Sequence, residues 1–148
     1  PLAKEKNQPI MLDISEELPP VFVDEDMMLR VFINLLENAS KYTPSNLPLV
    51  VGARLDPQVE DSGEGSSTAE CWVQFWVKDN GGGISEEEKE WIFDKFSRLE
   101  RHQGKASGYG LGLAYCRLAV EAHGGKLWVE SQQGQGASFH LRLPCSRL

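Results

Sequence analysis

The chain has 148 residues, of which 41% are hydrophobic and 25% are charged, and its net charge is −7. This length and composition are typical of one globular domain, 1–148, that buries about two thirds of its unfolded surface. The acidic balance argues against non-specific binding to nucleic acid or to an anionic membrane surface. No apolar run approaches the roughly 18 residues of a membrane-spanning helix. Because the sequence does not begin with Met, we expect a fragment of a longer protein.

The three cysteines, Cys71, Cys116 and Cys145, form no CxxC pair. An odd number without metal-ligand spacing favours buried or free thiols over a disulfide framework or a zinc site. We therefore expect reduced cysteines in a reducing compartment.

The first predicted elements are two short strands, at 10–14 and 18–23, and a long helix at 24–42. Asp24 is a good N-cap, and Pro44 prevents the helix from continuing. Apolar residues wrap most of the helix, because Leu29, Ile33 and Leu36 lie on a different side from the series that recurs at core spacing. That series is Met28, Val31, Phe32, Leu35, Ala39 and Tyr42. We expect this helix to lie inside the fold.

The remaining side of the helix is a polar stripe within a sector of roughly 100°. Its members are Arg30, Asn34, Glu37, Asn38 and Lys41. Buried amides need partners, since an unpaired one costs about 1–3 kcal/mol. The stripe is therefore either the floor of a hydrated or ligand-filled cleft or an ordinary solvated face, and the helix alone leaves both open.

Further strands are predicted at 47–55, 71–78, 126–131 and 137–143, with helices that begin at Ser85 and cover 111–123. The acidic, Gly- and Ser-rich segment 55–70 is predicted to be a mobile insertion. The basic segment 97–109 is predicted to be a loop. This mixture of strands and helices indicates an α+β domain of two layers.

Two glycine stretches could carry chemistry. Gly108 to Gly112 opens a helix, where backbone N–H groups favour an anion such as phosphate, although a structural turn fits equally well. Asp79 to Gly83 puts a carboxylate at the end of a strand, where it could accept from an exocyclic amine or simply cap a turn.

The order of these features resembles the ATP-binding domain of sensor histidine kinases, in the group that includes gyrase, Hsp90 and MutL. The matching boxes are 34–42, 79–83, 93–96, 108–112 and 134–139, and together they span most of the chain. The resemblance implies a Bergerat-type two-layer fold. Its mixed, mostly antiparallel sheet has about five strands, and about three helices cover one face.

The resemblance also implies roles in binding Mg²⁺ and ATP. Asn38 would be the metal ligand, Lys41 a phosphate contact, and Asp79 the acceptor for the adenine amine. Phe93 and Phe96 would anchor an ATP lid at 97–109. Further contacts to the nucleotide would come from Asn34, Tyr42, Gly81, Gly83, Ile84, Arg98, Arg101, Gly108, Tyr109, Gly110, Leu111, Gly112, Leu113 and Ser138. Lys41 and Arg98 are the candidate γ-phosphate contacts, and Ser138 either reaches the base through water or faces a neighbouring strand.

Asn34 distinguishes between the branches of this group. ATP-hydrolysing members and serine kinases have a Glu at that position, and an amide cannot act as a base. The resemblance therefore implies transfer of the γ-phosphoryl group to a histidine, whose neutral imidazole has a free lone pair. His102, His123 and His140 lie outside any phosphoacceptor motif.

The acceptor would belong to an upstream helical dimerisation domain, with a response regulator receiver domain as a further partner. The domain would be cytoplasmic, whether or not the full-length protein is anchored in a membrane. Two alternatives remain: a nucleotide-binding regulatory module without transferase activity, and an anti-sigma-type serine kinase.

Overall fold

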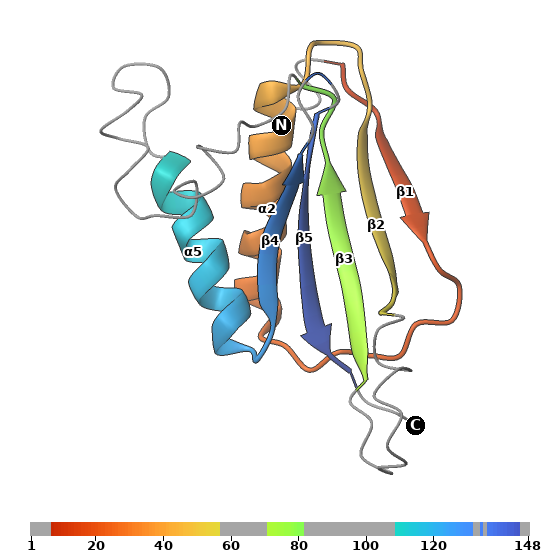
Figure 1. Ribbon diagram of the computed structural model, residues 1–148, viewed down its shortest axis with the longest axis vertical. Helices are drawn as coiled ribbons and strands as arrows, with labels where there is room; N and C mark the ends of the chain where they lie inside the picture. Colours follow the sequence, from red (N-terminus) through yellow and green to blue (C-terminus); the bar gives the residue numbers. More distant parts are fainter. Residues whose placement is uncertain (1–6, 57–70, 82–108, 132–133, 135, 146–148) are drawn as a thin grey trace.

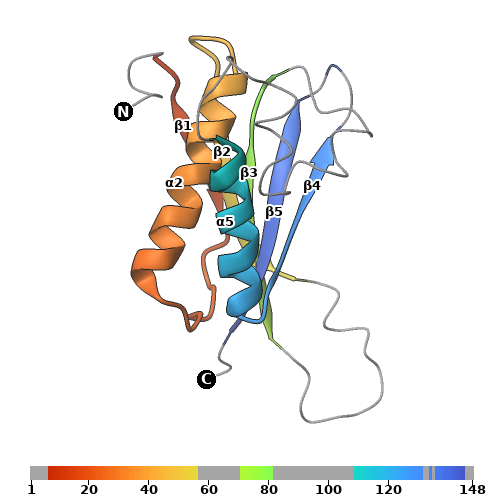
Figure 2. The same cartoon turned by 90° about the vertical axis from the view of Figure 1, so that its left-hand side faces the viewer.

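The computed structural model describes residues 7–56, 71–81, 109–131, 134 and 136–145. Five strands form one sheet: β1 (Ile10–Ile14), β2 (Leu49–Leu55), β3 (Trp72–Lys78), β4 (Lys126–Ser131) and β5 (Ala137–Pro144). Their order is β1-β2-β3-β5-β4. Only the β1–β2 pair is parallel. The helices α2 (Glu25–Tyr42) and α5 (Tyr109–Ala122) lie on the same side of this sheet (Figures 1 and 2).

This architecture confirms the predicted α+β fold with a mixed, mostly antiparallel sheet of five strands. The described residues contain two helices, and the helix predicted to begin at Ser85 lies outside them, as do the insertion at 57–70 and residues 97–108 of the predicted lid. The strand predicted at 18–23 is wrong. Only Val21 pairs there, in a single bridge to Cys145.

The core fills the space between the two helices and the sheet. Alternate residues of β5, namely Phe139, Leu141 and Leu143, are fully or almost fully buried. Val31 and Leu35 of α2 are buried against them in the same cluster. Burial of each such side chain stabilises the fold by about 1.5–3 kcal/mol. Every second residue of a strand and every third or fourth residue of a helix faces the core, so the apolar pattern of the sequence explains the packing.

The opposite side of α2 is exposed, which contradicts the expectation of an enclosed helix. Leu29 is 61% exposed and Ile33 is 43% exposed. A helix contacts its neighbours along limited stripes, and here the core contacts extend from Val31 and Leu35 to Leu36 but leave Leu29 and Ile33 exposed. The presence of apolar residues on the remaining side of α2 therefore did not indicate that this side is buried.

The expectation of three reduced cysteines is also wrong, because Cys71 and Cys145 form a disulfide. They are 74 residues apart in sequence, but β3 and β5 are antiparallel neighbours whose ends meet. The Cys145 N–H donates to the Cys71 carbonyl at 2.8 Å. The Cα atoms are 5.1 Å apart, within the range that a disulfide requires.

The third cysteine helps to join the two antiparallel helices. Burial raises the pKa of Cys116 to about 12, so its protonated thiol can donate to the Val31 carbonyl, with a sulfur–oxygen distance of 3.6 Å. At the other end of the pair, His123 Nε2 accepts from the Asp24 N–H at 3.0 Å, and its Nδ1 donates to the Ala119 carbonyl. No helix in the described part of the chain is long and apolar enough to cross a membrane.

Candidate functional site

Four segments that carry the predicted nucleotide contacts meet at one end of the fold. The C-terminal end of α2, the N-terminal end of α5 and the end of β3 all lie near the top of Figure 1. The turn before β5 joins them, because Asp79 and Ala137 are paired through their backbones at 2.9 Å. The sheet thus brings the first and third glycine boxes together beside the helix pair.

Asp79 is the most enclosed carboxylate among the residues that the structure describes. It is 3% exposed, and its Oδ1 accepts from the Gly81 and Ala137 N–H groups, each at 2.9 Å. Burial raises the pKa of Asp79, and the two N–H donors oppose that shift. These two hydrogen bonds fix the orientation of the Asp79 carboxylate. A fixed orientation is needed if the carboxylate is to recognise one particular hydrogen-bond donor of a ligand.

Gly136 lies close against Asp79, a contact that the sequence analysis missed. A Cβ at Gly136 would lie 2.5 Å from the Asp79 carbonyl oxygen and 3.0 Å from Oδ1. Its φ of +82° also disfavours any other residue. The only sequence signal was the glycine box itself, since no local pattern states which distant residue a glycine contacts.

Thr43 and Asn80 form a second link that the sequence analysis missed. Thr43, which follows α2, is 1% exposed, and its Oγ1 accepts from the Asn80 N–H at 2.8 Å. The Asn80 amide donates to the Pro48 carbonyl at 2.6 Å. The turn after β3 is therefore fixed to the end of α2, next to Lys41 and Tyr42.

The polar stripe of α2 divides into an enclosed part and an exposed part. Asn38 is 3% exposed, and Asn34 and Lys41 are half-buried, whereas Arg30 and Glu37 are exposed. The Asn34 amide nitrogen lies 3.5 Å from the Gly112 carbonyl of α5. Asn34 thus faces the beginning of α5, while Arg30 and Glu37 belong to an ordinary solvated surface.

Other predicted contacts have different outcomes. Gly83, Ile84, Phe93, Phe96, Arg98, Arg101 and Gly108 lie outside the described residues, and Tyr109, Gly110 and Leu111 are described only as the first turn of α5. Leu113 is buried in the core at 2% exposure. Tyr42 is 45% exposed. Ser138 pairs with Lys78 and Glu130, and by strand alternation its side chain lies on the side of the sheet away from Phe139 and the helices.

A metal at this end would need oxygen ligands of a particular kind. The described residues contain no group of three or more His, Cys, Asp or Glu side chains that could hold a metal ion. Mg²⁺ commonly takes one or two protein oxygens and completes its shell with phosphates and water. The enclosed amide of Asn38 offers one such oxygen.

The sequence matches a known family over residues 23–147, described as the histidine kinase-, DNA gyrase B-, and HSP90-like ATPases. It is 42% identical over 142 residues to the adaptive-response sensory kinase SasA of Synechocystis sp., and 43% identical over 148 residues to that of Synechococcus sp.. These alignments cover 96% and 100% of this chain but only 34% and 36% of the relatives. The chain therefore spans about a third of the length of these relatives.

Solved structures show the same fold. Full-length ShkA in complex with AMPPNP matches with a TM-score of 0.76 and 28% identity, over 99% of this chain and 27% of that one. The mycobacterial sensor histidine kinase MprB matches with a TM-score of 0.71 and 26% identity, over 99% of this chain and 90% of that one. The catalytic domain of the histidine kinase ThkA matches with a TM-score of 0.70 and 28% identity, over 97% and 82%. The chain belongs to the histidine kinase-, DNA gyrase B- and HSP90-like ATPase family, as an ATP-binding domain of the sensor histidine kinase type.

Proposed function

We propose that this domain binds Mg-ATP and transfers the γ-phosphoryl group to a histidine on a separate helical dimerisation domain of a two-component sensor kinase. The observation that carries this proposal is that Asp79 lies in a turn fixed to the end of α2 through the Asn80–Thr43 hydrogen bond, while Asn34 of the same helix faces the beginning of α5. The carboxylate of Asp79 can accept a hydrogen bond from the adenine amine. The amides of Asn34 and Asn38 and the N-terminus of α5 suit the Mg²⁺ ion and the negatively charged phosphates.

Each group has a role that follows from its chemistry. Asp79 Oδ1 already accepts two N–H groups, so Oδ2 is the oxygen that we assign to the adenine amine. The Asn38 amide oxygen is the proposed Mg²⁺ ligand, and Lys41 is the proposed phosphate contact. The first turn of α5 adds backbone N–H groups and the positive end of a helix dipole, which favour phosphate. Bound Mg²⁺ would neutralise phosphate charge at this end.

Asn34 supports transfer to histidine over hydrolysis or transfer to serine. Its amide nitrogen points to the Gly112 carbonyl, and an amide cannot take a proton from water or a hydroxyl. A neutral imidazole needs no such base. The protein contribution is then positional and electrostatic: it orients the γ-phosphoryl group and shields its charge.

The acceptor is proposed to lie outside this chain. His123 is bonded through both ring nitrogens, and His140 is held in the sheet by Gln74 and Glu130, so neither is presented to a nucleotide. His102 lies outside the described residues. We propose a dimerisation domain as the phosphoacceptor and a receiver domain as the next partner. A cytoplasmic location is part of this proposal, because ATP is available there, although a disulfide such as Cys71–Cys145 is rare in that compartment.

The proposal is tested by titrating the domain with ATP in the presence and absence of Mg²⁺ and measuring affinity by calorimetry. Asn38→Ala is expected to abolish most of the Mg²⁺ dependence, because the oxygen ligand is removed. Asn38→Asp keeps an oxygen at the same place and is expected to retain it. Arg30→Ala, an exposed change on the same helix, should leave the titration unchanged.

Transfer is tested separately by adding the helical dimerisation domain and radiolabelled ATP. Acid-labile phosphate on the added domain, and none on this domain alone, is the expected result. Mg-ATP binding by Asn38→Ala at the affinity of the unmodified chain would refute the metal assignment. Phosphate on a serine of a partner would favour the serine kinase alternative.

A further inference from the structure

The side of the sheet away from the helices plays no part in the proposed function. Its side chains nevertheless follow a regular pattern of residue types. Figures 1 and 2 show both helices on the other side. The strand pairings align the outward residues in rows that cross β2, β3, β5 and β4. One row is aromatic, and the row beside it is cationic.

The aromatic row consists of Trp76, His140 and Trp128, which lie directly opposite one another on β3, β5 and β4. The imidazole stacks with Trp76 at 6.5 Å and with Trp128 at 5.5 Å between ring centroids. Gly52 extends the row on β2, where a Cβ would lie only 2.0 Å from the Trp76 indole. The missing side chain leaves room for the Trp76 indole over Gly52. We call the row of Trp76, His140 and Trp128 the platform.

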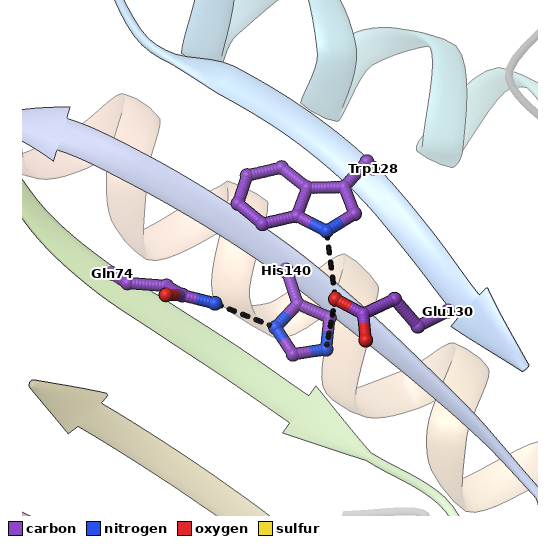
Figure 3. A network of polar contacts seen from close by, with 4 residues as sticks. All are labelled: Gln74, Trp128, Glu130 and His140. Carbon is purple, nitrogen blue, oxygen red and sulfur yellow. Dashed lines mark hydrogen bonds and ion pairs between the residues drawn. The ribbon is translucent and has the colours of Figure 1, made fainter. Parts of the chain in front are cut away.

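Polar contacts fix this platform in place (Figure 3). The Gln74 amide lies 3.1 Å from His140 Nδ1, and the other ring nitrogen lies 3.4 Å from Glu130. The same carboxylate accepts from the Trp128 indole N–H at 2.9 Å. Because the amide donates to Nδ1, the proton of the neutral ring is on Nε2 and points to Glu130. The network holds the carboxylate of Glu130 to the platform.

The cationic row consists of Arg54, Arg142 and Lys126, with Gln74 between the two arginines. Strands lie about 4.8 Å apart, so the backbone positions of these three residues span about 14 Å across the sheet. They line a depression of about 540 Å³ together with Trp128, Gln74 and two carboxylates. On a chain whose net charge is −7, this is a locally positive surface.

The two carboxylates of the depression are already engaged. Asp56 is 3.8 Å from Arg142, and Glu130 bonds to the aromatic row. Arg54 and Lys126 instead lie over indole rings, at 5.7 Å from the Trp76 centroid and 5.8 Å from the Trp128 centroid, and neither forms an ion pair with another described residue. The Arg142 guanidinium also lies over an indole ring, 4.7 Å from the Trp72 centroid. The depression therefore offers N–H donors and positive charge to an incoming anion.

We infer that this surface, defined by Arg54, Arg142 and Lys126 with Trp128, is a docking site for an acidic segment of a partner protein. Trp and Arg are the residues most enriched at the energetic centres of protein interfaces. A pocket for a small ligand is usually lined mainly by apolar side chains, whereas six of the seven residues of this depression are polar or charged. A chain of carboxylates spread over about 14 Å matches three cations on three strands better than one compact anion does.

The inference is tested with an acetylated and amidated peptide that alternates Glu and Ser, which presents a carboxylate every ~6.8 Å on one side when extended. The matched control peptide has Gln in place of Glu. Binding is followed through the indole N–H signals in ¹H–¹⁵N spectra of the domain. We expect the Glu peptide to shift the Trp128 signal, to lose affinity as salt rises, and to bind far more tightly than the Gln peptide.

Charge reversal provides the second arm. Arg54→Glu is expected to weaken binding of the Glu peptide by about tenfold or more, whereas Arg117→Glu, the same change on exposed α5, should have little effect. Both variants should bind Mg-ATP as the unmodified chain does, which separates this inference from the proposed function. Equal effects of the two reversals, or equal binding of the Gln peptide, would overturn the inference. Citrate that shifts the same indole signals at concentrations where the Glu peptide does not would assign the depression to a small anion instead.

Discussion

The two sides of the sheet are built from the same strands but have different roles: one forms the core with the helices, and the other is the outer surface. Phe139 is fully buried among the helices, while the next residue, His140, stacks between two indoles on the outer side. Val77 and Trp76 on β3 show the same division. Because side chains alternate, one strand residue can contribute to the core and its neighbour to recognition without either constraining the other.

The two sides differ in the substitutions that they tolerate. The helix side is a close-packed apolar core, so a substitution that changes side-chain volume or shape there lowers stability. The outer side depends on register, because Gln74, His140 and Glu130 bond only if β3, β5 and β4 keep their alignment. The candidate nucleotide site uses both kinds of support, since Asp79 ends β3 and is held by the backbone that begins β5.

The largest effect is expected from truncating neighbours on the two sides. Phe139→Ala should lower the free energy of unfolding by about 3–5 kcal/mol, because it leaves a cavity in the core. His140→Ala should cost about 1 kcal/mol from lost aromatic stacking. Chemical denaturation of both variants measures the difference. Equal losses would mean that the aromatic row is as much a part of the folding core as Phe139.

The disulfide is expected to have the next largest effect. Replacing Cys71 and Cys145 together by Ser should lower the free energy of unfolding by about 2–4 kcal/mol, since the cross-link closes a long loop of the unfolded chain. A reducing agent should reproduce the loss in the unmodified chain and have no further effect on the double variant. The Mg-ATP titration should be unchanged, because the bond lies at the opposite end of β3 from Asp79. A chain whose stability does not respond to reduction would contradict a formed disulfide.

Elements with strong local signals were predictable from the sequence. The helix of α2 was fixed by Asp24, whose side chain accepts from the Met27 N–H, and by the proline that follows its end. The alternation at 71–78 and 137–143 predicted β3 and β5. One failure concerns the sides of α2. The sequence of α2 does not state which of its sides is covered, so the exposure of Leu29 and Ile33 was missed.

Long-range pairing explains the remaining gaps in the candidate site and the cysteines. β5 lies between β3 and β4, an order that no local pattern encodes. That order brings the Ala137 N–H to Asp79 across 58 residues and Cys145 to Cys71 across 74. The boxes of the family predicted which residues gather, while the supports provided by Gly136 and Thr43 depend on this topology.

The smallest expected effect is a pH dependence that separates the outer side from the core. Burial lowers the pKa of His140 from its usual 6.5, opposed by the charge of Glu130 and assisted by that of Arg54. The unfolded chain then binds the proton more readily, so stability is greatest above about pH 6.5 and falls as the pH drops toward the pKa of the folded state. The difference in unfolding free energy between the unmodified chain and His140→Ala, measured from neutral to acid pH, should shrink as the pH falls. A difference that stays constant or grows would mean that the network of Gln74 and Glu130 holds the charged ring as well as the neutral one.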